Sequence, residues 1–216
     1  MEKRIGVLFD LDGTLLDTLE DLADATNYTL RYFGCPELTV AQVRSIVGNG
    51  ALKLMRDARP EGAQQPDPNE MLKVYVPYYE ANSDHKTKPY DGVLQALKEV
   101  AEKYPVAIVS NKPDGAVKLL CQKYFPGYYA LGQRDDCPRK PNPDMVYKAM
   151  ADLGVDTCIY VGDSEVDVLT AKNAGVPCLS VLWGFRDRAM LEENGAAYFC
   201  ADTAKLTACI EEMANG

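Results

Sequence analysis

Two aspartates stand two positions apart where a short apolar run ends. The run covers residues 4–9, and Asp10, Asp12 and Gly13 follow it. If the run is a buried strand, residues at positions i and i+2 leave it on the same side, which brings both carboxylates together. Two such acids repel each other unless a cation or a proton separates them. The pair therefore indicates either a polar turn with a side-chain cap or a site that holds a cation.

Three further polar groups come directly after other apolar runs or in a neighbouring loop. Ser110 and Asp163 each follow such a run, and Lys140 lies in a loop before an expected helix. Each has an ordinary explanation, because Ser110 and Asp163 could cap helices and Lys140 could be a solvated charge. In a parallel sheet, however, the carboxyl ends of the strands form one ligand-binding edge. Convergence of all these groups on that edge favours a catalytic site.

Strands and helices must alternate to bring these groups to one edge, and the sequence has that pattern. Buried strands are predicted from short apolar runs at residues 4–9, 106–109, 158–161 and 178–182. Helices are predicted from the spacing of apolar residues at 92–103, 113–124, 143–153 and 203–214. Such alternation is typical of a parallel sheet with helices on both faces. We therefore predict an α/β fold with a three-layer α/β/α, Rossmann-like parallel-sheet core.

A long segment with helical patterns only interrupts this alternation. Four helices are predicted there, at residues 19–32, 40–46, 51–58 and 69–79. Polar residues border the segment at 17–18 and 82–84 and could serve as hinges. We therefore predict an α-helical cap subdomain at residues 16–84, inserted into a catalytic core made of residues 1–15 and 85–216.

The composition limits the partners and the compartment. A formal charge of −9 and an isoelectric point near 4.7 disfavour binding to nucleic acid, which requires clustered lysine and arginine. No apolar run approaches the ~18 residues needed to span a bilayer, so we expect no membrane contact. Seven cysteines without a CxxC pair argue against a disulfide scaffold or a zinc knuckle. We expect a cytoplasmic protein, monomeric or homodimeric, in which carboxylates carry the chemistry because His85 is the single histidine.

The groups described above stand in motifs that resemble those of the haloacid dehalogenase superfamily, in its phosphatase branch with a helical cap. The motifs are DLDGTLLDT from Asp10, VSN ending at Asn111, KPNP from Lys140 and GDSEVD from Gly162. Within the family the chain is most similar to phosphoglycolate phosphatases, through VGNG at residues 47–50 and the VSNKP form of the second motif. The dehalogenases of the superfamily lack the second aspartate, so Asp12 favours phosphate esters as substrates.

The resemblance implies Mg²⁺-dependent hydrolysis of a phosphomonoester through an aspartyl phosphate. Asp10 would be the nucleophile, and Asp12 would be the general acid that protonates the leaving group and then the base that activates water. Ser110 would donate a hydrogen bond to a phosphate oxygen. Lys140 would neutralise negative charge on the nucleophile and on the phosphoryl group.

The resemblance also implies the ligands of the Mg²⁺ ion. The carboxylates of Asp10 and Asp163 and the main-chain carbonyl of Asp12 would hold it, and water and phosphate would complete the octahedron. Asp167 is better placed to support these ligands than to bind the ion itself.

The cap is expected to select a small phosphorylated metabolite, and the resemblance favours 2-phosphoglycolate. The sequence GNG at residues 48–50 precedes a predicted cap helix. Its backbone N–H groups could bind the substrate carboxylate, although a glycine turn between two helices explains it equally well. Asn49 is therefore a candidate for contact with the leaving group. Asn111 and Lys112 are candidates because they directly follow Ser110, and Thr14 is a further substrate-binding candidate.

Other functions remain compatible with the motifs. Capped members of the family include phosphosugar mutases and phosphatases of sugar phosphates or pyrophosphate, and the spacing does not exclude them. Release of free phosphate from a monophosphate, without a bisphosphate activator, would distinguish a phosphatase from a mutase. A non-enzymatic phospho-receiver-like binding module shares the aspartate and the lysine. It needs neither a second acid at Asp12 nor a cap, which argues against it.

Overall fold

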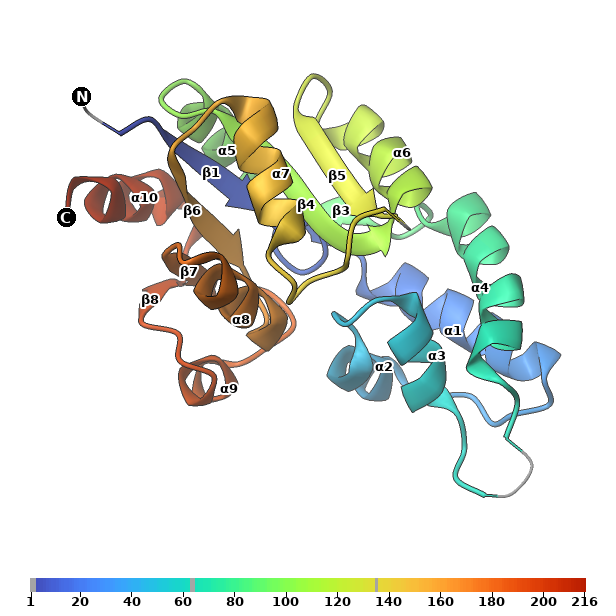
Figure 1. Cartoon of the computed structure of the whole chain (residues 1–216). Helices are drawn as coiled ribbons and strands as arrows, with labels where there is room; N and C mark the ends of the chain where they lie inside the picture. The colour runs from blue at the N-terminus through green and yellow to red at the C-terminus, as the bar shows by residue number, and fades with distance from the viewer. Residues whose placement is uncertain (1–2, 63–64, 135) are drawn as a thin grey trace.

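A six-stranded parallel sheet forms the centre of the molecule (Figure 1). The computed structural model describes residues 3–62, 65–134 and 136–216. The sheet has the order β5-β4-β1-β6-β7-β8, and every neighbouring pair is parallel. Its strands are β1 (Ile5–Phe9), β4 (Val106–Pro113), β5 (Tyr129–Gln133), β6 (Thr157–Gly162), β7 (Cys178–Val181) and β8 (Tyr198–Cys200). The predicted parallel sheet is confirmed, and the edge strands β5 and β8 are additions to it.

Helices cover both faces of this sheet. They are α5 (Val93–Ala101), α6 (Asp114–Tyr124), α7 (Asp144–Leu153), α8 (Glu165–Ala174), α9 (Arg188–Glu193) and α10 (Leu206–Asn215), with a short 3₁₀ turn at Thr203–Lys205. Alternate residues of a strand point to opposite faces. Val7 and Phe9 accordingly pack in one buried cluster with Leu97 of α5. Leu8 packs in a separate cluster with Met145 of α7, which confirms the three-layer arrangement.

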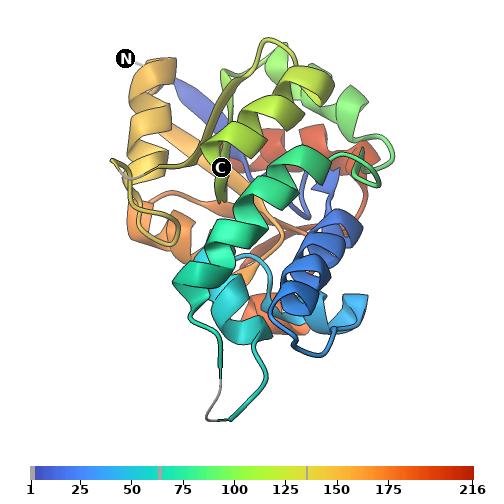
Figure 2. The ribbon, with the colours of Figure 1, turned by 90° about the vertical axis from the view of Figure 1, so that its right-hand side faces the viewer.

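The four helices predicted between the first and second core strands are present. They are α1 (Leu19–Tyr32), α2 (Val40–Ile46), α3 (Ala51–Ala58) and α4 (Pro68–Asn82). These inserted helices gather at one end of the molecule (Figure 2). They share a buried cluster that includes Leu30, Met55 and Tyr75, together with Ala116 and Phe185 from elsewhere in the chain. The inserted helices therefore have a core of their own that also contacts the sheet domain.

Two short strands connect the inserted helices to the sheet. β2 (Leu16–Asp17) and β3 (Lys88–Pro89) pair antiparallel where the chain leaves the core and where it returns. Between β1 and β2 the chain turns tightly, and the φ angle of Gly13 is 80°, a left-handed value that favours glycine. The Gly13 N–H donates to the Leu16 carbonyl at 2.9 Å. This turn holds the loop after β1 next to the inserted helices.

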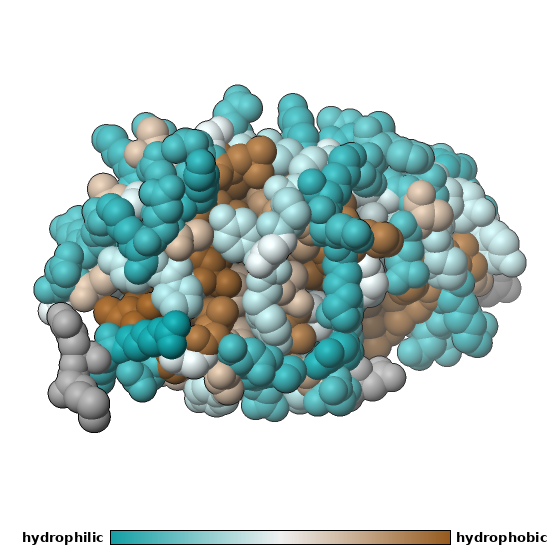
Figure 3. Space-filling view, turned by 90° about the horizontal axis from the view of Figure 1, so that it is seen from above, coloured by the Kyte–Doolittle hydropathy of each residue, from teal (hydrophilic) through white to brown (hydrophobic). Residues whose placement is uncertain are grey.

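Most apolar side chains lie inside the molecule. The face seen in Figure 3 is mostly hydrophilic, with hydrophobic residues in separate places. Large apolar or aromatic side chains that remain exposed are spread over several elements, such as Tyr32 on α1, Leu119 on α6 and Tyr198 on β8. Among the described residues, no helix combines the length and the hydropathy that a membrane-spanning helix requires.

Candidate active site

Three adjacent strands bring predicted catalytic groups to one edge of the sheet. β4, β1 and β6 are neighbours and run in the same direction. Asp10 directly follows β1, and Asp163 directly follows β6. Ser110 was expected after a strand ending at Val109, and this was wrong, because β4 continues to Pro113 through an irregular register. Ser110 therefore lies within a strand, where its position is fixed by the sheet.

The ammonium group of Lys140 connects the end of β1 to α8 through buried ion pairs. Its Nζ atom lies 2.8 Å from Asp10 Oδ1 and 2.8 Å from Asp167 Oδ1. The hydroxyl of Tyr160, on β6, lies 3.0 Å from the same Nζ atom. Lys140 is only 1% exposed, so water screens these contacts little. The cation is thus placed to stabilise negative charge on Asp10 or on a group bound to it.

Asn111 fixes the loop that carries Lys140. Its Oδ1 accepts a hydrogen bond from the Lys140 N–H at 2.7 Å, and its Nδ2 donates to the Lys140 carbonyl at 2.9 Å. The same Nδ2 donates to the carbonyl of Gly48, among the inserted helices, at 3.2 Å. The side-chain amide of Asn111 is therefore engaged with the main chain on both sides, and its contact with substrate stays a prediction.

Asp163 is held by contacts from two segments, residues 13–14 and 184–185. The Thr14 hydroxyl donates to its Oδ1 at 3.1 Å, and the Phe185 N–H donates to its Oδ2 at 2.7 Å. A Cβ atom added to Gly13 or to Gly184 would lie 2.3 Å from side-chain atoms of Asp163. Any side chain at either glycine would displace this carboxylate. Thr14, a predicted substrate-binding residue, is thus turned toward Asp163.

The carboxylates at this edge carry more negative charge than one lysine balances. Oxygens of Asp10, Asp163 and Asp167 all lie within 4.8 Å of one another. Burial, and then the charge of Asp167, raise the pKa of Asp10 well above its usual value and the pKa of Asp163 to about 7. Burial opposes the charge on Lys140, but Asp10 and Asp167 outweigh it and raise the pKa of this lysine. An excess of hard carboxylate oxygens fits the predicted Mg²⁺ ion.

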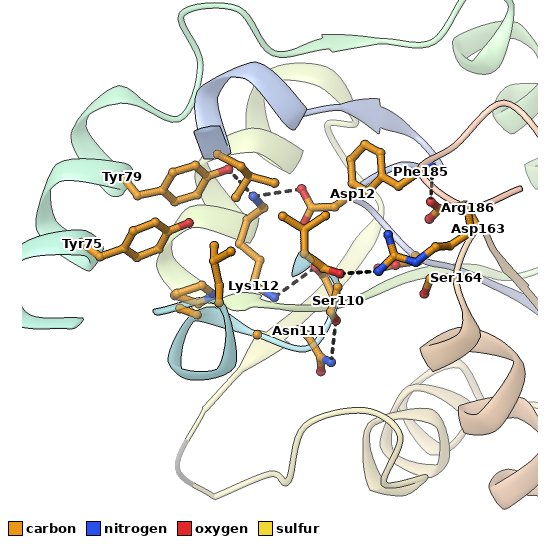
Figure 4. A pocket seen from close by; sticks show the side chains of 18 residues that line it. Asp12, Tyr75, Tyr79, Ser110, Asn111, Lys112, Asp163, Ser164, Phe185 and Arg186 are labelled. Carbon is orange, nitrogen blue, oxygen red and sulfur yellow. Dashed lines mark hydrogen bonds and ion pairs between the residues drawn. The ribbon is translucent and has the colours of Figure 1, made fainter. Parts of the chain in front are cut away.

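A second buried lysine contacts Asp12 (Figure 4). The Lys112 Nζ atom lies 2.9 Å from Asp12 Oδ1, and the Thr18 hydroxyl donates to the same oxygen at 2.6 Å. Lys112 also donates to the hydroxyl of Tyr79 and lies 4.3 Å from the centre of its ring. Tyr79 belongs to α4, so these contacts link an inserted helix to the residue that is expected to transfer protons.

A pocket lies between the sheet edge and the inserted helices. One wall is polar and contains Asp10, Asp12, Ser110, Lys112 and Asp163. The facing wall is mainly apolar and contains Leu22, Leu54, Tyr75, Tyr79 and Phe185. The cavity volume is about 50 Å³, so it holds a few molecules of the size of water. Of the segment predicted to bind the leaving group, Gly48 and Gly50 are among the described lining residues and Asn49 is not.

Phe185 and Arg186 were not among the predicted site residues. Both line the pocket, and Arg186 is 6% exposed with its Nε atom 2.8 Å from Glu165 Oε2. They follow β7, whose carboxyl end lies at the same edge as those of β1 and β6. Asp163 was predicted because it follows a strand of the parallel sheet, and the same criterion could have indicated Phe185 and Arg186. The segment that carries them contains none of the recognised sequence motifs.

Known proteins resemble this chain over most of its length. The haloacid dehalogenase-like hydrolase family model matches residues 7–181. A phosphoglycolate phosphatase of Rhodobacter capsulatus is 36% identical over 187 residues, which are 83% of this chain and 85% of that protein. Phosphoglycolate phosphatase 1 of Pseudomonas aeruginosa is 31% identical over 220 residues, which are 97% of this chain and 80% of that protein. A crystal structure from Lactobacillus delbrueckii subsp. bulgaricus, of a protein to which phosphoglycolate phosphatase activity is ascribed, has a TM-score of 0.88 at 34% identity and covers 96% of this chain and 98% of that one.

Proposed function

Because the chain belongs to the haloacid dehalogenase-like hydrolase family, we propose that it is a Mg²⁺-dependent phosphatase that acts on a small phosphomonoester through an aspartyl phosphate on Asp10. The buried contact between Lys140 and Asp10, with Asp163 beside them, supports this most directly. Lys140 and the Leu11 N–H both contact Oδ1 of Asp10, the latter at 2.7 Å. This arrangement orients the carboxylate and leaves its Oδ2 to attack phosphorus.

In the first step, Oδ2 of Asp10 forms a bond to phosphorus while the bond from phosphorus to the ester oxygen breaks. Asp12 donates a proton to the departing oxygen, so that an alcohol leaves instead of an alkoxide. Ser110 donates a hydrogen bond to a phosphoryl oxygen, and Lys140 balances the charge that accumulates on the transferred group. The product of this step is an aspartyl phosphate and a deprotonated Asp12.

In the second step, the carboxylate of Asp12 takes a proton from a water molecule. The oxygen of that water attacks phosphorus, and the bond between phosphorus and Asp10 breaks. Inorganic phosphate leaves, Asp10 is again a carboxylate, and Asp12 is again protonated. Lys112 and Thr18 hold Asp12 in place for both transfers.

The carboxylates of Asp10 and Asp163 and the main-chain carbonyl of Asp12 are the groups that would hold Mg²⁺. When bound, the ion supplies positive charge that offsets the charge of the acids and of the phosphoryl oxygens. Asp167 would support these ligands, because Lys140 engages its Oδ1 at 2.8 Å and Ser164 donates to its Oδ2 from N at 3.1 Å and from Oγ at 2.6 Å.

The affinity for Mg²⁺ is expected to rise with pH until about pH 7. Burial and Asp167 raise the pKa of Asp163 to about 7 in the metal-free protein, so below this pH the ion must displace a proton. Each proton displaced makes the association constant rise about tenfold per pH unit below the pKa of Asp163. Calorimetric titration with Mg²⁺ across this range measures the effect. An affinity that stays constant from mildly acidic to neutral pH would contradict it.

Residues 16–84 are proposed to act as a cap that selects the substrate and excludes water during transfer. The apolar wall of the pocket comes mainly from these helices. We propose that these helices move away from the sheet edge to admit a substrate and return for the reaction.

The proposed substrate is 2-phosphoglycolate. Two relatives carry the name phosphoglycolate phosphatase, the cavity is small, and the Lys112 ammonium group beside Asp12 can pair with a carboxylate on the leaving group. A screen of phosphate release with Mg²⁺ should include 2-phosphoglycolate, sugar phosphates, nucleotides and pyrophosphate. We expect the highest kcat/KM for 2-phosphoglycolate, and chelation should abolish release. Isomerisation of a sugar phosphate without release of phosphate would instead identify a mutase.

We place the reaction in the cytoplasm. All seven cysteines are free, and four of them are buried. Reduced thiols of this kind are typical of a reducing compartment.

A further inference from the structure

The segment after β7 and helix α2 are tied together by two arginines, each of which donates to main-chain carbonyls of the other's segment. Arg44 of α2 donates from Nε to the Phe185 carbonyl at 2.7 Å and from Nη2 to the Gly184 carbonyl at 2.9 Å. In return, Arg186 donates from Nη1 to the Arg44 carbonyl at 2.7 Å and from Nη2 to the Val47 carbonyl at 2.7 Å. We call these four hydrogen bonds the arginine clasp.

The clasp is strong for two physical reasons. The donors are charged, and hydrogen bonds from charged donors contribute more than neutral ones. Glu165 of α8 fixes the guanidinium of Arg186, with Nε at 2.8 Å from Oε2, and Arg186 is 6% exposed. The carbonyls of Arg44 and Val47 lie at the end of α2, where a helix leaves carbonyl groups without helical partners. The clasp therefore provides hydrogen bonds to these two carbonyl groups, which would otherwise lose hydrogen bonds to water when the inserted helices pack on the sheet domain.

The same segment contacts the active site directly. The Phe185 N–H donates to Asp163 Oδ2 at 2.7 Å, and the Phe185 ring packs in the buried cluster of the inserted helices. At Gly184, an added Cβ atom would lie 2.3 Å from the Asp163 Cβ and 2.4 Å from the Gly13 carbonyl oxygen. Figure 4 shows Phe185 and Arg186 at the rim of the pocket beside Asp163. Three consecutive residues thus touch both the inserted helices and a carboxylate of the sheet edge.

We propose that Arg44 and Arg186 are positioning residues whose clasp docks the inserted helices on the core and, through Phe185, couples that docking to the orientation of Asp163. This inference rests on the proposed function, because it assigns Asp163 to the Mg²⁺ site. When the helices move away, the Phe185 ring leaves its cluster and the N–H that orients Asp163 moves with it. Cap closure and Mg²⁺ binding therefore favour each other, and such coupling is reciprocal.

The test uses three variants of the full chain. Arg186→Lys and Arg44→Lys keep the charge but remove the planar fork that binds two carbonyls at once, and the double variant combines them. Arg188→Lys is the matched control, because Arg188 lies two residues away in an exposed pair with Glu192, at 2.7 Å and with side chains 58% and 50% exposed.

Trp183, the only tryptophan of the chain, directly precedes the segment and donates from Nε1 to the Thr14 carbonyl at 3.0 Å. Because Thr14 in turn contacts Asp163, we expect the fluorescence of Trp183 to change on Mg²⁺ binding without any substrate.

We expect Arg186→Lys to weaken Mg²⁺ binding about tenfold, the size expected for lost hydrogen bonds from a charged group. Amide hydrogen exchange in α2 should become faster in this variant, and added Mg²⁺ should slow this exchange in the wild-type protein. Because both arginines act in one clasp, the double variant should bind Mg²⁺ within about twofold of Arg186→Lys alone. Arg188→Lys should match the wild-type protein in both measurements.

Unchanged Mg²⁺ affinity and unchanged exchange in α2 for a folded Arg186→Lys protein would overturn the inference. If that variant does not fold, the same two measurements on Arg44→Lys decide. The inference would also be overturned if the double variant lost Mg²⁺ affinity by the product of the two single losses. The two arginines would then act independently and not in one clasp. Failure of the proposed function has a different signature: the wild-type protein would show the coupling between Mg²⁺ and α2 and yet release no phosphate from any monoester.

Discussion

Replacing Asp10 by asparagine is expected to lower phosphate release by about four orders of magnitude or more, the scale seen when a covalent nucleophile is removed. Asparagine has nearly the same shape, but its amide cannot form the acyl phosphate. The fold should persist, because Lys140 retains Asp167 as a partner at 2.8 Å and burial already disfavours the charge on Asp10. Steady-state phosphate release and a thermal unfolding curve measure the two effects.

The matched control for this variant is Asp24→Asn. Asp24 is an exposed aspartate on α1, 2.7 Å from Lys86, and lies outside the pocket. The Asp24→Asn substitution should leave turnover unchanged. If Asp10→Asn retained more than about a tenth of the wild-type rate while folded, the aspartyl phosphate would be ruled out as the main route.

Replacing Lys140 by methionine is expected to damage both stability and catalysis. The substitution leaves Asp10 and Asp167 buried and close together without their shared cation. Breaking a buried pair in this way costs about 3–5 kcal/mol of unfolding free energy. Turnover should fall by about a thousandfold, because the charge on the transferred phosphoryl group is no longer balanced. Urea unfolding without Mg²⁺ and phosphate release with Mg²⁺ test the two parts separately.

The stability loss in Lys140→Met should shrink as the pH is lowered, since protonation of Asp10 removes the repulsion. Lys148→Met is the control, because Lys148 forms an exposed pair with Asp152 on α7, at 3.3 Å. The loss of unfolding free energy in Lys148→Met should stay below about 1 kcal/mol. Equal losses for the two methionine variants would show that the buried ion pairs do not hold the site together.

The central strands could be predicted from sequence because they are buried on both faces. β1 and β6 are short apolar runs bounded by polar residues or glycine, β7 is a short run with a single polar residue, Ser180, and the structure has all three. β5 and β8 were not predicted, because edge strands keep part of their side chains in water. β8, for example, lies in a run of apolar residues at 196–201 but has only three strand residues, and its Tyr198 is 52% exposed.

The sheet edge of the candidate site was accessible to sequence analysis for the same reason. Asp10 and Asp163 directly follow strands of one parallel sheet, so topology alone brings them together. Phe185 follows β7 at the same edge, but Arg44 and its contact with Phe185 could not be found in this way. Their contact joins positions 141 residues apart, and it depends on how α2 packs against the sheet domain. On the sequence alone, Arg44 looks like a solvated charge on an amphipathic helix.

The most direct test of the central claim is to trap phosphate on Asp10 in the Asp12→Asn variant. With p-nitrophenyl phosphate the leaving group needs little protonation, so the first step proceeds, but the introduced amide cannot take a proton from water for the second. We expect a burst of nitrophenol equal to the enzyme concentration, and a phosphate adduct on the Asp10 peptide by mass spectrometry after acid quenching. Nitrophenol release at the wild-type rate with no adduct on Asp10, or an adduct on another residue, would contradict the account.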